Sequence, residues 1–364
     1  MTIRFAVVSD PHIALPETIE DTSQRFHLVE VSISALELAF EHLEHLDLDF
    51  LLMPGDLTQD GEPENHRWLQ QRLARLPFPA YIVPGNHDVP SLVATDRNIG
   101  LHDFPSYYQA FGYDNPNQLY YTKEIYPGVQ LVGLNSNQFN PQGKQLGVLD
   151  EEQLLWLEQT LVQFQNKFVL IIVHHNVLEH LPGQAEHELG KRYMLDNAPT
   201  LRKILQNAGV KLILTGHLHV QDIVQSEGLC EITTGSLVSY PHPYRIVELD
   251  RDASQGDCLR IKTHRIESTP QYQDLLAYSQ KMMSDRSYPF MMKLLTIPPV
   301  SLPIEQANLL APKLHTFWSQ IAAGDTLFDF PDFPSKVREH FQKFGAINSQ
   351  GKPALIDNQA TLYL

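Results

Sequence analysis

The sequence has very little cysteine, with only Cys230 and Cys258 among 364 residues and no Cys-x-x-Cys spacing. So few thiols argue against a disulfide framework and favour a reducing compartment. The first ten residues lack the apolar region and the small-residue cleavage site of a signal peptide, and no apolar run approaches the length of a membrane span. We therefore expect a soluble, cytoplasmic protein that does not contact a membrane.

Positive charge is also scarce. Lys and Arg together number 27 against 43 Asp and Glu, which leaves a formal net charge of −16. Such a chain offers no evident basic track for a polyanion, so we expect no nucleic-acid polymer among its partners. A local positive site for a small anion remains compatible with this balance.

The order of the predicted elements indicates an α/β protein. Short apolar runs predict strands, and segments with helical periodicity lie between several of them. Four further strand-like runs between 222 and 266 are joined by turns that contain glycine, which predicts hairpins. The predicted strands are 3–8, 49–53, 80–83, 130–135, 168–173 and 210–214, and the predicted helices are 28–46, 150–164 and one that starts near Asn197. This alternation predicts a layered architecture.

The pattern of predicted secondary structure changes near residue 270. The remaining segments resemble short helices broken by Pro303, Pro331 and Pro334, and four of the seven methionines fall within 282–292. We therefore divide the chain into residues 1–268, a catalytic domain, and residues 269–364, a helical C-terminal extension. The extension is expected to form either a cap beside a functional site of the first domain or a homodimer contact, and the homodimer contact is slightly favoured.

Polar side chains of a particular kind follow five of the predicted strands. Because neighbouring loops converge beyond the carboxyl ends of strands in open α/β sheets, these groups are expected to meet in space. The five segments are Ser9-Asp10-Pro11-His12, Pro54-Gly55-Asp56, Gly85-Asn86-His87-Asp88, His174-His175-Asn176 and Gly216-His217-Leu218-His219. Each one alone is explained by turn chemistry or by a single buried histidine. Turn chemistry does not readily explain why five such segments each follow a predicted strand in one chain.

The donor set is chemically coherent. It offers two aspartates, one asparagine carbonyl and four imidazoles without any thiolate, which suits Mn, Fe, Zn or Co. Seven ligands are too many for one four-coordinate ion, but they suffice for two divalent ions if one carboxylate bridges them. Two such ions, two carboxylates and a bridging hydroxide leave a net charge of about +1, which attracts a phosphate and supplies a nucleophile at neutral pH.

The five motifs resemble those of the calcineurin-like metallophosphoesterase superfamily, over roughly residues 3 to 265. They are SDPH (9–12), GDLTQDG (55–61), GNHD (85–88), VHHN (173–176) and GHLH (216–219). The resemblance implies a layered β-sandwich flanked by helices. The segment beyond residue 270 has no counterpart in the minimal domain of that superfamily.

The resemblance also implies a role for each matching residue. It makes Asp10, His12, Asp56 and His219 ligands of the first ion, and it makes Asp56 a bridge to a second ion completed by Asn86, His174 and His217. His87 would face the phosphate together with Asn86 and protonate the leaving oxygen, and Asp88 would orient its imidazole. His175 is either structural or substrate-facing.

Two positions depart from the pattern of the superfamily. Asn176 stands where a proline commonly follows the histidine pair, which puts the shape of that loop in doubt. Asn135 stands where an aspartate is common, with an effect that the sequence leaves open. Arg25, His27, Tyr107 and His187 are candidates for the pocket wall, within the loops 13–27, 89–118 and 177–196.

The motif set is most similar to that of the cyclic-nucleotide (class III) phosphodiesterase group, because GNHD and GHLH occur without the arginine that protein phosphatases carry after the second motif. The expected function is a binuclear metal-dependent phosphodiesterase acting on a small nucleotide such as cyclic AMP. The alternatives are a phosphomonoesterase, a hydrolase of nucleotide-sugar or lipid phosphates, and, less favoured, a nuclease. A non-enzymatic scaffold is disfavoured because no ligand of the set is missing.

Overall fold

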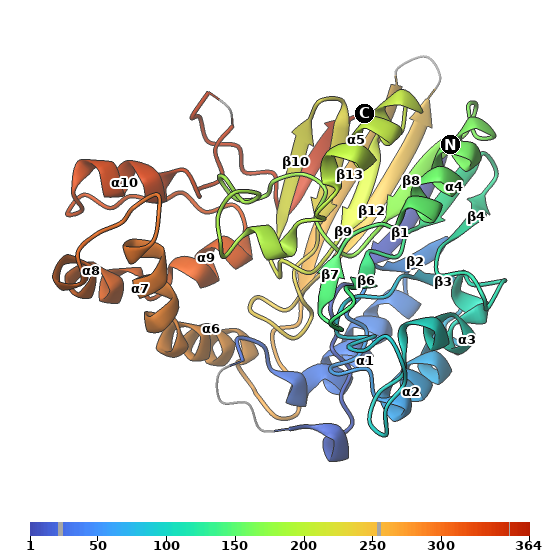
Figure 1. Ribbon diagram of the computed structural model, residues 1–364, viewed down its shortest axis with the longest axis horizontal. Coiled ribbons are helices and arrows are strands. Elements are labelled where there is room, and N and C mark those ends of the chain that lie inside the picture. Colours follow the sequence, from blue (N-terminus) through green and yellow to red (C-terminus); the bar gives the residue numbers. More distant parts are fainter. Residues whose placement is uncertain (21–24, 253–255, 349) are drawn as a thin grey trace.

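Two six-stranded sheets form the centre of the protein in the computed structural model, which describes residues 1–20, 25–252, 256–348 and 350–364. The C-terminal helices extend to one side of these sheets (Figure 1). The predicted α/β class, with a β-sandwich flanked by helices and a helical C-terminal region, is confirmed.

The first sheet has the strand order β14-β13-β12-β1-β2-β3. Its strands are β1 (Thr2–Val7), β2 (Phe50–Met53), β3 (Ala80–Ile82), β12 (Pro243–Asp252), β13 (Gly256–Arg265) and β14 (Gln359–Tyr363). The pairs β1–β2 and β2–β3 are parallel, whereas β12, β13 and β14 add to the sheet as antiparallel strands. The carboxyl ends of β1, β2 and β3 therefore lie at the same edge.

The second sheet has the order β10-β11-β9-β8-β5-β4, with parallel pairing from β11 to β5 and an antiparallel strand at each edge. Its strands are β4 (Tyr121–Tyr126), β5 (Val129–Gly133), β8 (Phe168–Ile172), β9 (Leu212–Thr215), β10 (Asp222–Ser226) and β11 (Leu229–Thr233). A small hairpin of β6 (Asn137–Phe139) and β7 (Gln145–Gly147) lies apart from both sheets. The predicted strands of this region are all present, and β4 and the small hairpin are additional.

Alternation along the strands divides the apolar side chains between two cores. On β9, Leu212 and Leu214 belong to the core shared with the first sheet, while Ile213 belongs to a core on the opposite face. Successive side chains of a strand point to opposite faces, so the second sheet is buried on both sides.

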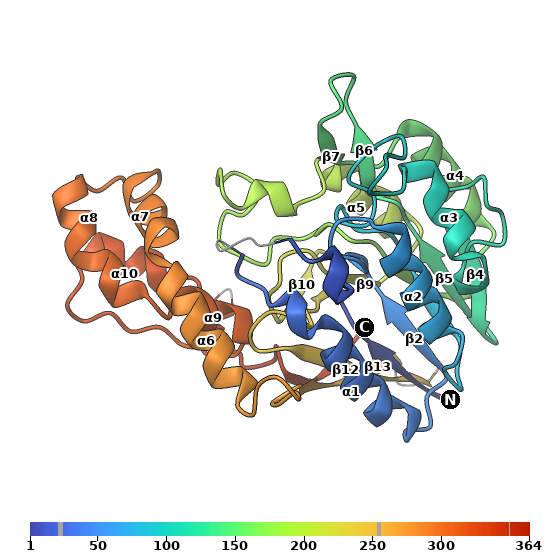
Figure 2. The same ribbon diagram turned by 90° about the horizontal axis from the view of Figure 1, so that it is seen from below.

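Helices cover the outer faces of the two sheets, as Figures 1 and 2 show from two directions. The α-helices that precede the C-terminal extension are α1 (Ser32–Glu44), α2 (Pro63–Leu73), α3 (Phe104–Tyr107), α4 (Glu151–Val162) and α5 (Ala198–Asn207). Leu36 and Phe40 of α1 are fully buried in the first core, whereas Leu157 of α4 and Leu201 of α5 are buried in the second. The helices predicted at 28–46, at 150–164 and near Asn197 correspond to α1, α4 and α5.

The C-terminal extension consists largely of short helices, whose apolar core also includes Leu218 and Val220 from the segment after β9. They are α6 (Leu275–Arg286), α7 (Tyr288–Thr296), α8 (Ile304–Leu310), α9 (Phe317–Ala323) and α10 (Ser335–Gln342). The chain then returns to the first sheet, where β14 pairs with β13 and buries Ala360 and Leu362. The last strand of the extension is thus an edge strand of the first sheet, which the sequence did not predict. Within the part of the chain that the structure describes, no helix is long and apolar enough to cross a membrane.

Candidate metal centre

The predicted ligands come from the ends of five parallel strands in both sheets. Asp10 and His12 follow β1, Asp56 follows β2, Asn86 follows β3, His174 follows β8, and His217 and His219 follow β9. The structure brings them together at one edge of the sandwich, where six of them form two groups that share Asp56 and the seventh, Asn86, lies beside His174.

The first group contains Asp10, His12, Asp56 and His219, with one potential ligand atom of each lying within 4.8 Å of the others. Nε2 of His219 is 3.2 Å from Oδ1 of Asp10 and 3.3 Å from Nε2 of His12. Nε2 of His12 is 3.8 Å from Oδ2 of Asp56. Ligand atoms that surround an ion at 2.0–2.2 Å lie roughly 3 to 4 Å from one another, so these spacings suit a cation.

The second group contains Asp56, His174 and His217. Nε2 of His174 is 3.3 Å from Oδ2 of Asp56 and 3.2 Å from Oδ1 of Asn86. Nδ1 of His174 lies 2.8 Å from the carbonyl oxygen of Pro54, to which it donates in the neutral ring. Its Nε2 is then a bare acceptor facing two oxygen acceptors, which is an arrangement that needs a cation or a proton at its centre.

The histidines are held in orientations that suit metal ligation. The outer ring nitrogen of a metal-bound histidine normally bonds to a second group, which aims the other nitrogen at the ion. Nδ1 of His219 lies 3.1 Å from the Ser239 hydroxyl, and Nε2 of His217 lies 3.2 Å from the carbonyl of Arg192. His12 differs, since its Nδ1 is buried with no hydrogen-bond partner among the described residues and its ring stacks on His27 at 4.6 Å.

The backbone at the site adopts an uncommon conformation. Five of the predicted ligands have positive φ angles between 43° and 67°, namely Asp10, His12, Asp56, His217 and His219. Such angles are uncommon for residues other than glycine and concentrate at functional sites, where the surrounding structure compensates the strain. The turns after β1, β2 and β9 are therefore bent so that these side chains point to the centre.

Two glycines allow the turns that carry the predicted ligands to approach one another closely. A Cβ at Gly216 would overlap the side chains of Ser9 and Asp10, and a Cβ at Gly85 would overlap Asp56. The glycine before His217 is consequently required by the close approach of the turn after β9 to the turn after β1.

His87 lies in the pocket beside both groups, with its side chain 31% exposed. Its Nδ1 lies 2.6 Å from the carbonyl of Gln59, to which it donates, and its backbone N–H donates to Oδ1 of Asp56 at 2.8 Å. Burial alone would lower the pKa of His87, but the carboxylates of Asp56 and Asp60 outweigh burial and raise this pKa to about 9.

Asp88 has partners other than the imidazole of His87. Its buried carboxylate accepts hydrogen bonds from the backbone N–H groups of Leu57, Thr58 and Gly85 at 2.8–3.0 Å. The structure therefore shows Asp88 tying the turn after β2 to the turn after β3, while Gln59 orients His87. Burial, and then the nearby Asp56, raise the pKa of Asp88 to about 7.

The remaining predicted positions are buried around the centre. His175 borders the pocket and its Nδ1 is 2.8 Å from the Ser136 hydroxyl. Asn176, which replaces the usual proline, donates to the Thr215 hydroxyl at 3.0 Å and accepts from Gln184 at 3.1 Å. Asn135 accepts from the backbone of Asn137 at 3.0 Å, so both asparagines stabilise loops.

A pocket of about 470 Å³ opens over the metal centre. Of the predicted wall residues, Arg25 and His27 line it, whereas Tyr107 lies beside His66 and His187 lines a different hollow. Residues 21–24 of the predicted wall loop lie outside the described residues. Arg192 and Tyr193 also line the pocket; they lie in the predicted wall loop 177–196, although the sequence did not single them out within it.

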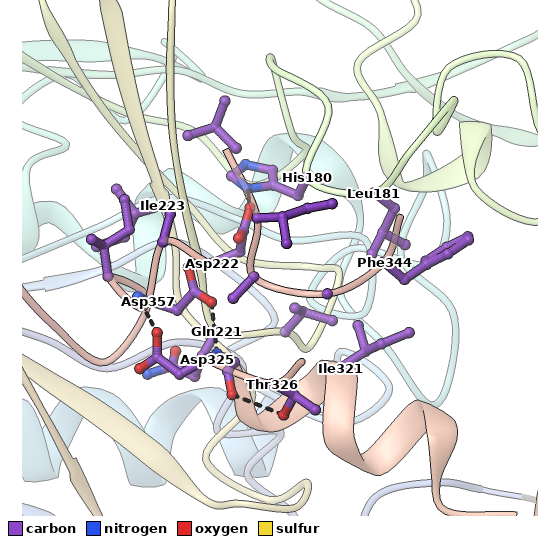
Figure 3. A pocket seen from close by; sticks show the side chains of 18 of the residues that line it. His180, Leu181, Gln221, Asp222, Ile223, Ile321, Asp325, Thr326, Phe344 and Asp357 are labelled. Carbon is purple, nitrogen blue, oxygen red and sulfur yellow. Dashed lines mark hydrogen bonds and ion pairs between the residues drawn. The ribbon is translucent and has the colours of Figure 1, made fainter. Parts of the chain in front are cut away.

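A second hollow of about 510 Å³ lies between β10 and the C-terminal extension. Figure 3 shows His180 and Asp222 pointing toward each other there, with Asp325 and Asp357 nearby. Nδ1 of His180 is 2.6 Å from Asp222, and its Nε2 forms an ion pair with the fully buried Glu231 at 3.1 Å. Burial would lower the pKa of His180, but Glu231 and then Asp222 outweigh it and raise this pKa to about 10.

This ion pair predicts a pH-dependent contribution to stability. A histidine with a raised pKa stabilises the folded state fully below its ordinary value of 6.5, and the contribution is lost as the pH rises toward 10. His180→Gln is expected to lower the free energy of unfolding by about 3 kcal/mol at pH 6, because Glu231 loses its cationic partner and keeps only hydrogen bonds from neutral donors such as Val177, Leu178 and Thr215. Urea denaturation between pH 6 and 10 should show the difference from the native protein shrinking with pH. The exposed His315 provides the control His315→Gln, and a difference independent of pH would contradict the assignment.

Comparison with known proteins identifies the family. Residues 3–221 match the model described as calcineurin-like phosphoesterase, and this range contains every predicted ligand. The chain belongs to that family. Calcineurin-like phosphoesterases use a dimetal centre, and this member is a metal-dependent phosphoester hydrolase with Asp and His side chains grouped for metal binding.

The relatives of this family member include several phosphodiesterases. It is 28% identical over 218 residues to "Probable glycerophosphodiester phosphodiesterase GpdQ" of Arcobacter nitrofigilis, with 58% of this chain and 70% of that protein covered. It is 29% identical over 222 residues to a 3′,5′-cyclic-nucleotide phosphodiesterase of Nostoc, with coverages of 60% and 72%. The 3′,5′-cyclic adenosine monophosphate phosphodiesterase of Escherichia coli is 27% identical over 177 residues, with coverages of 48% and 55%.

A solved structure shares the fold. The dimetal phosphatase from Danio rerio superimposes with a TM-score of 0.52 at 17% identity, covering 72% of this chain and 96% of that one. The likeness concerns the fold alone. The family model ends at residue 221, so the C-terminal helices lie outside the matched region.

Proposed function

We propose that this phosphoesterase is a phosphodiesterase that acts on a small nucleotide such as cyclic AMP. The observation that carries the proposal is the pair of ligand groups sharing Asp56, placed at the floor of a 470 Å³ pocket. A pocket of that size accommodates a small molecule and leaves room for more than a phosphate. Relatives named as cyclic-nucleotide and glycerophosphodiester phosphodiesterases support a diester substrate.

In this proposal Asp10, His12, Asp56 and His219 hold one divalent ion, and Asp56, Asn86, His174 and His217 hold the other. The donor set is again oxygen and imidazole nitrogen, which fits Mn, Fe, Zn or Co. The chemistry that two such ions supply is the activation of water at neutral pH and the neutralisation of charge on the phosphate.

His87 is the proposed general acid. Because Gln59 accepts from its Nδ1, its Nε2 is the atom available to a bound substrate. Nε2 would transfer a proton to the leaving oxygen as the bond to phosphorus breaks. Asp88 acts as a positioning residue, since it holds together the turns that carry Asp56 and His87. Asn86 and His175 border the same pocket, where they would also contact the phosphate or its substituent.

Hydrolysis of model substrates tests the function. Protein loaded with Mn or Fe to two ions per chain is expected to cleave bis(p-nitrophenyl) phosphate faster than p-nitrophenyl phosphate. Chelation should abolish both activities, and returning the metal should restore them. Failure to cleave the diester at full metal occupancy would refute the proposal, whereas faster cleavage of the monoester would favour a phosphomonoesterase.

A further inference from the structure

The C-terminal extension reaches the pocket over the metal centre. Met283 of α6 and Trp318 of α9 both line it, although the family model ends long before them. Figure 2 shows α6 and α9 at the end of the extension that adjoins the catalytic region. Met283 is buried, whereas Trp318 is half-exposed. An indole that is partly open to a pocket offers a planar surface to a ligand.

The extension also holds another wall of the same pocket. Arg286 of α6 donates a hydrogen bond to the carbonyl of Arg25. The ring of Phe290 lies 5.3 Å from Trp318 and 6.5 Å from Phe26. His27, which follows Phe26 in the chain, stacks on His12 of the candidate metal centre. The extension is thus connected to the predicted metal ligands through residues 25–27.

Several aromatic rings and two arginines line the pocket. Phe26, Tyr193 and Trp318 line it, and the guanidinium of Arg192 lies 4.7 Å above the ring of Tyr193. Arg25 is the second guanidinium at its rim. Aromatic rings alone would suit either a flat base or a quaternary ammonium group. The two arginines disfavour a cationic group and favour a flat, uncharged ring attached to an anion.

We propose that the C-terminal extension is part of the active site and that Trp318 binds the nucleobase of the substrate by stacking. The inference rests on the phosphodiesterase function proposed above, and it assigns the part of the substrate beyond the phosphate. Met283 lines the same pocket from α6, and residues 25–27 and Arg192 provide further parts of its wall. The extension then serves as a cap, irrespective of whether it also joins two chains.

Two ligands that differ only by the base provide the test. Adenosine 5′-monophosphate and ribose 5-phosphate carry the same sugar phosphate, and their binding to the metal-loaded full chain is measured by calorimetry. The native protein is expected to bind the first more tightly. Trp318→Ala should weaken adenosine 5′-monophosphate about five- to a hundredfold, which is the usual effect of losing one stacking side chain. Its effect on ribose 5-phosphate should stay within about twofold.

The matched control is Trp156→Ala, because Trp156 is a half-exposed indole on α4 that lines a different hollow. This variant should change neither affinity. Trp318→Leu retains an apolar contact with Phe290 and serves if the alanine variant does not fold. In the native protein, fluorescence quenching by adenosine 5′-monophosphate but not by ribose 5-phosphate gives a readout that needs no variant.

Three results would overturn the inference. The first is equal affinity of the native protein for the two ligands, and the second is a parallel loss of both in Trp318→Ala. The third is tighter binding of glycerophosphocholine than of adenosine 5′-monophosphate, since that order indicates a site for a cation. These results bear on recognition of the base and not on phosphodiester cleavage, which is tested separately by the hydrolysis of bis(p-nitrophenyl) phosphate and by its rate relative to p-nitrophenyl phosphate.

Discussion

Asp56→Asn is expected to reduce bound metal from two ions per chain toward one or none and to lower kcat/KM for bis(p-nitrophenyl) phosphate about a thousandfold or more. Asp56 is the residue shared by the two ligand groups, and its carboxylate is 1% exposed. Loss of its charge removes attraction for both ions at once, and ion-based catalysis contributes several kcal/mol.

Asparagine is the appropriate replacement because it keeps the shape of the site. Its side chain tolerates the φ of 46° at this position, and its Oδ1 still accepts from the backbone N–H of His87. Metal content by elemental analysis and steady-state kinetics measure the effect. The control Asp114→Asn alters an exposed carboxylate that pairs with Lys123 and should change neither quantity. Two tightly bound ions in Asp56→Asn would contradict the bridging role.

His87→Ala is expected to retain both ions and to lower kcat for cyclic AMP by about two to four orders of magnitude. The hydrogen bond from the backbone of residue 87 to Asp56 survives this change, so the ligand groups should stay in place. The p-nitrophenolate group is a weaker base and leaves with little need of a proton. The loss with bis(p-nitrophenyl) phosphate should therefore be much smaller, about tenfold.

The comparison of leaving groups separates two roles for the imidazole. If His87 only stabilises charge on the phosphate, its removal should lower both rates by a similar factor. If it donates the proton, the loss should increase with the basicity of the leaving oxygen. Loss of metal from His87→Ala would instead assign the residue to the ligand set.

The residues of the candidate metal centre were predictable from the sequence because they directly follow predicted strands. Asp10, Asp56 and His174 each follow a buried strand, and parallel strands bring their carboxyl ends to one edge. The structure places these side chains within 4.8 Å of their partners as expected. Sequence motifs do not specify hydrogen bonds between different loops. The sequence therefore did not predict the hydrogen-bond partners of Asp88 or the hydrogen bond between His87 and Gln59.

The C-terminal extension contains features that sequence patterns predicted and others that they did not. Helical periodicity and prolines predicted short helices beyond residue 270, and these are present. The pairing of β14 with β13 and the position of Trp318 at the pocket depend on contacts between segments far apart in the chain. No local periodicity encodes such contacts. The buried pair of His180 and Glu231 was missed for the same reason.

The amino-acid sequence by itself determined the strand–helix alternation, the identity of the side chains grouped for metal binding and their order along the chain, because these depend on local residue pattern. Tertiary structure alone decided which groups Asp88 and the imidazole of His87 bond to, why Gly216 and Gly85 must lack a side chain, and which distant helix borders the pocket. Those features arise where separate loops approach within contact distance, and only the packing of the two sheets and the extension sets that distance.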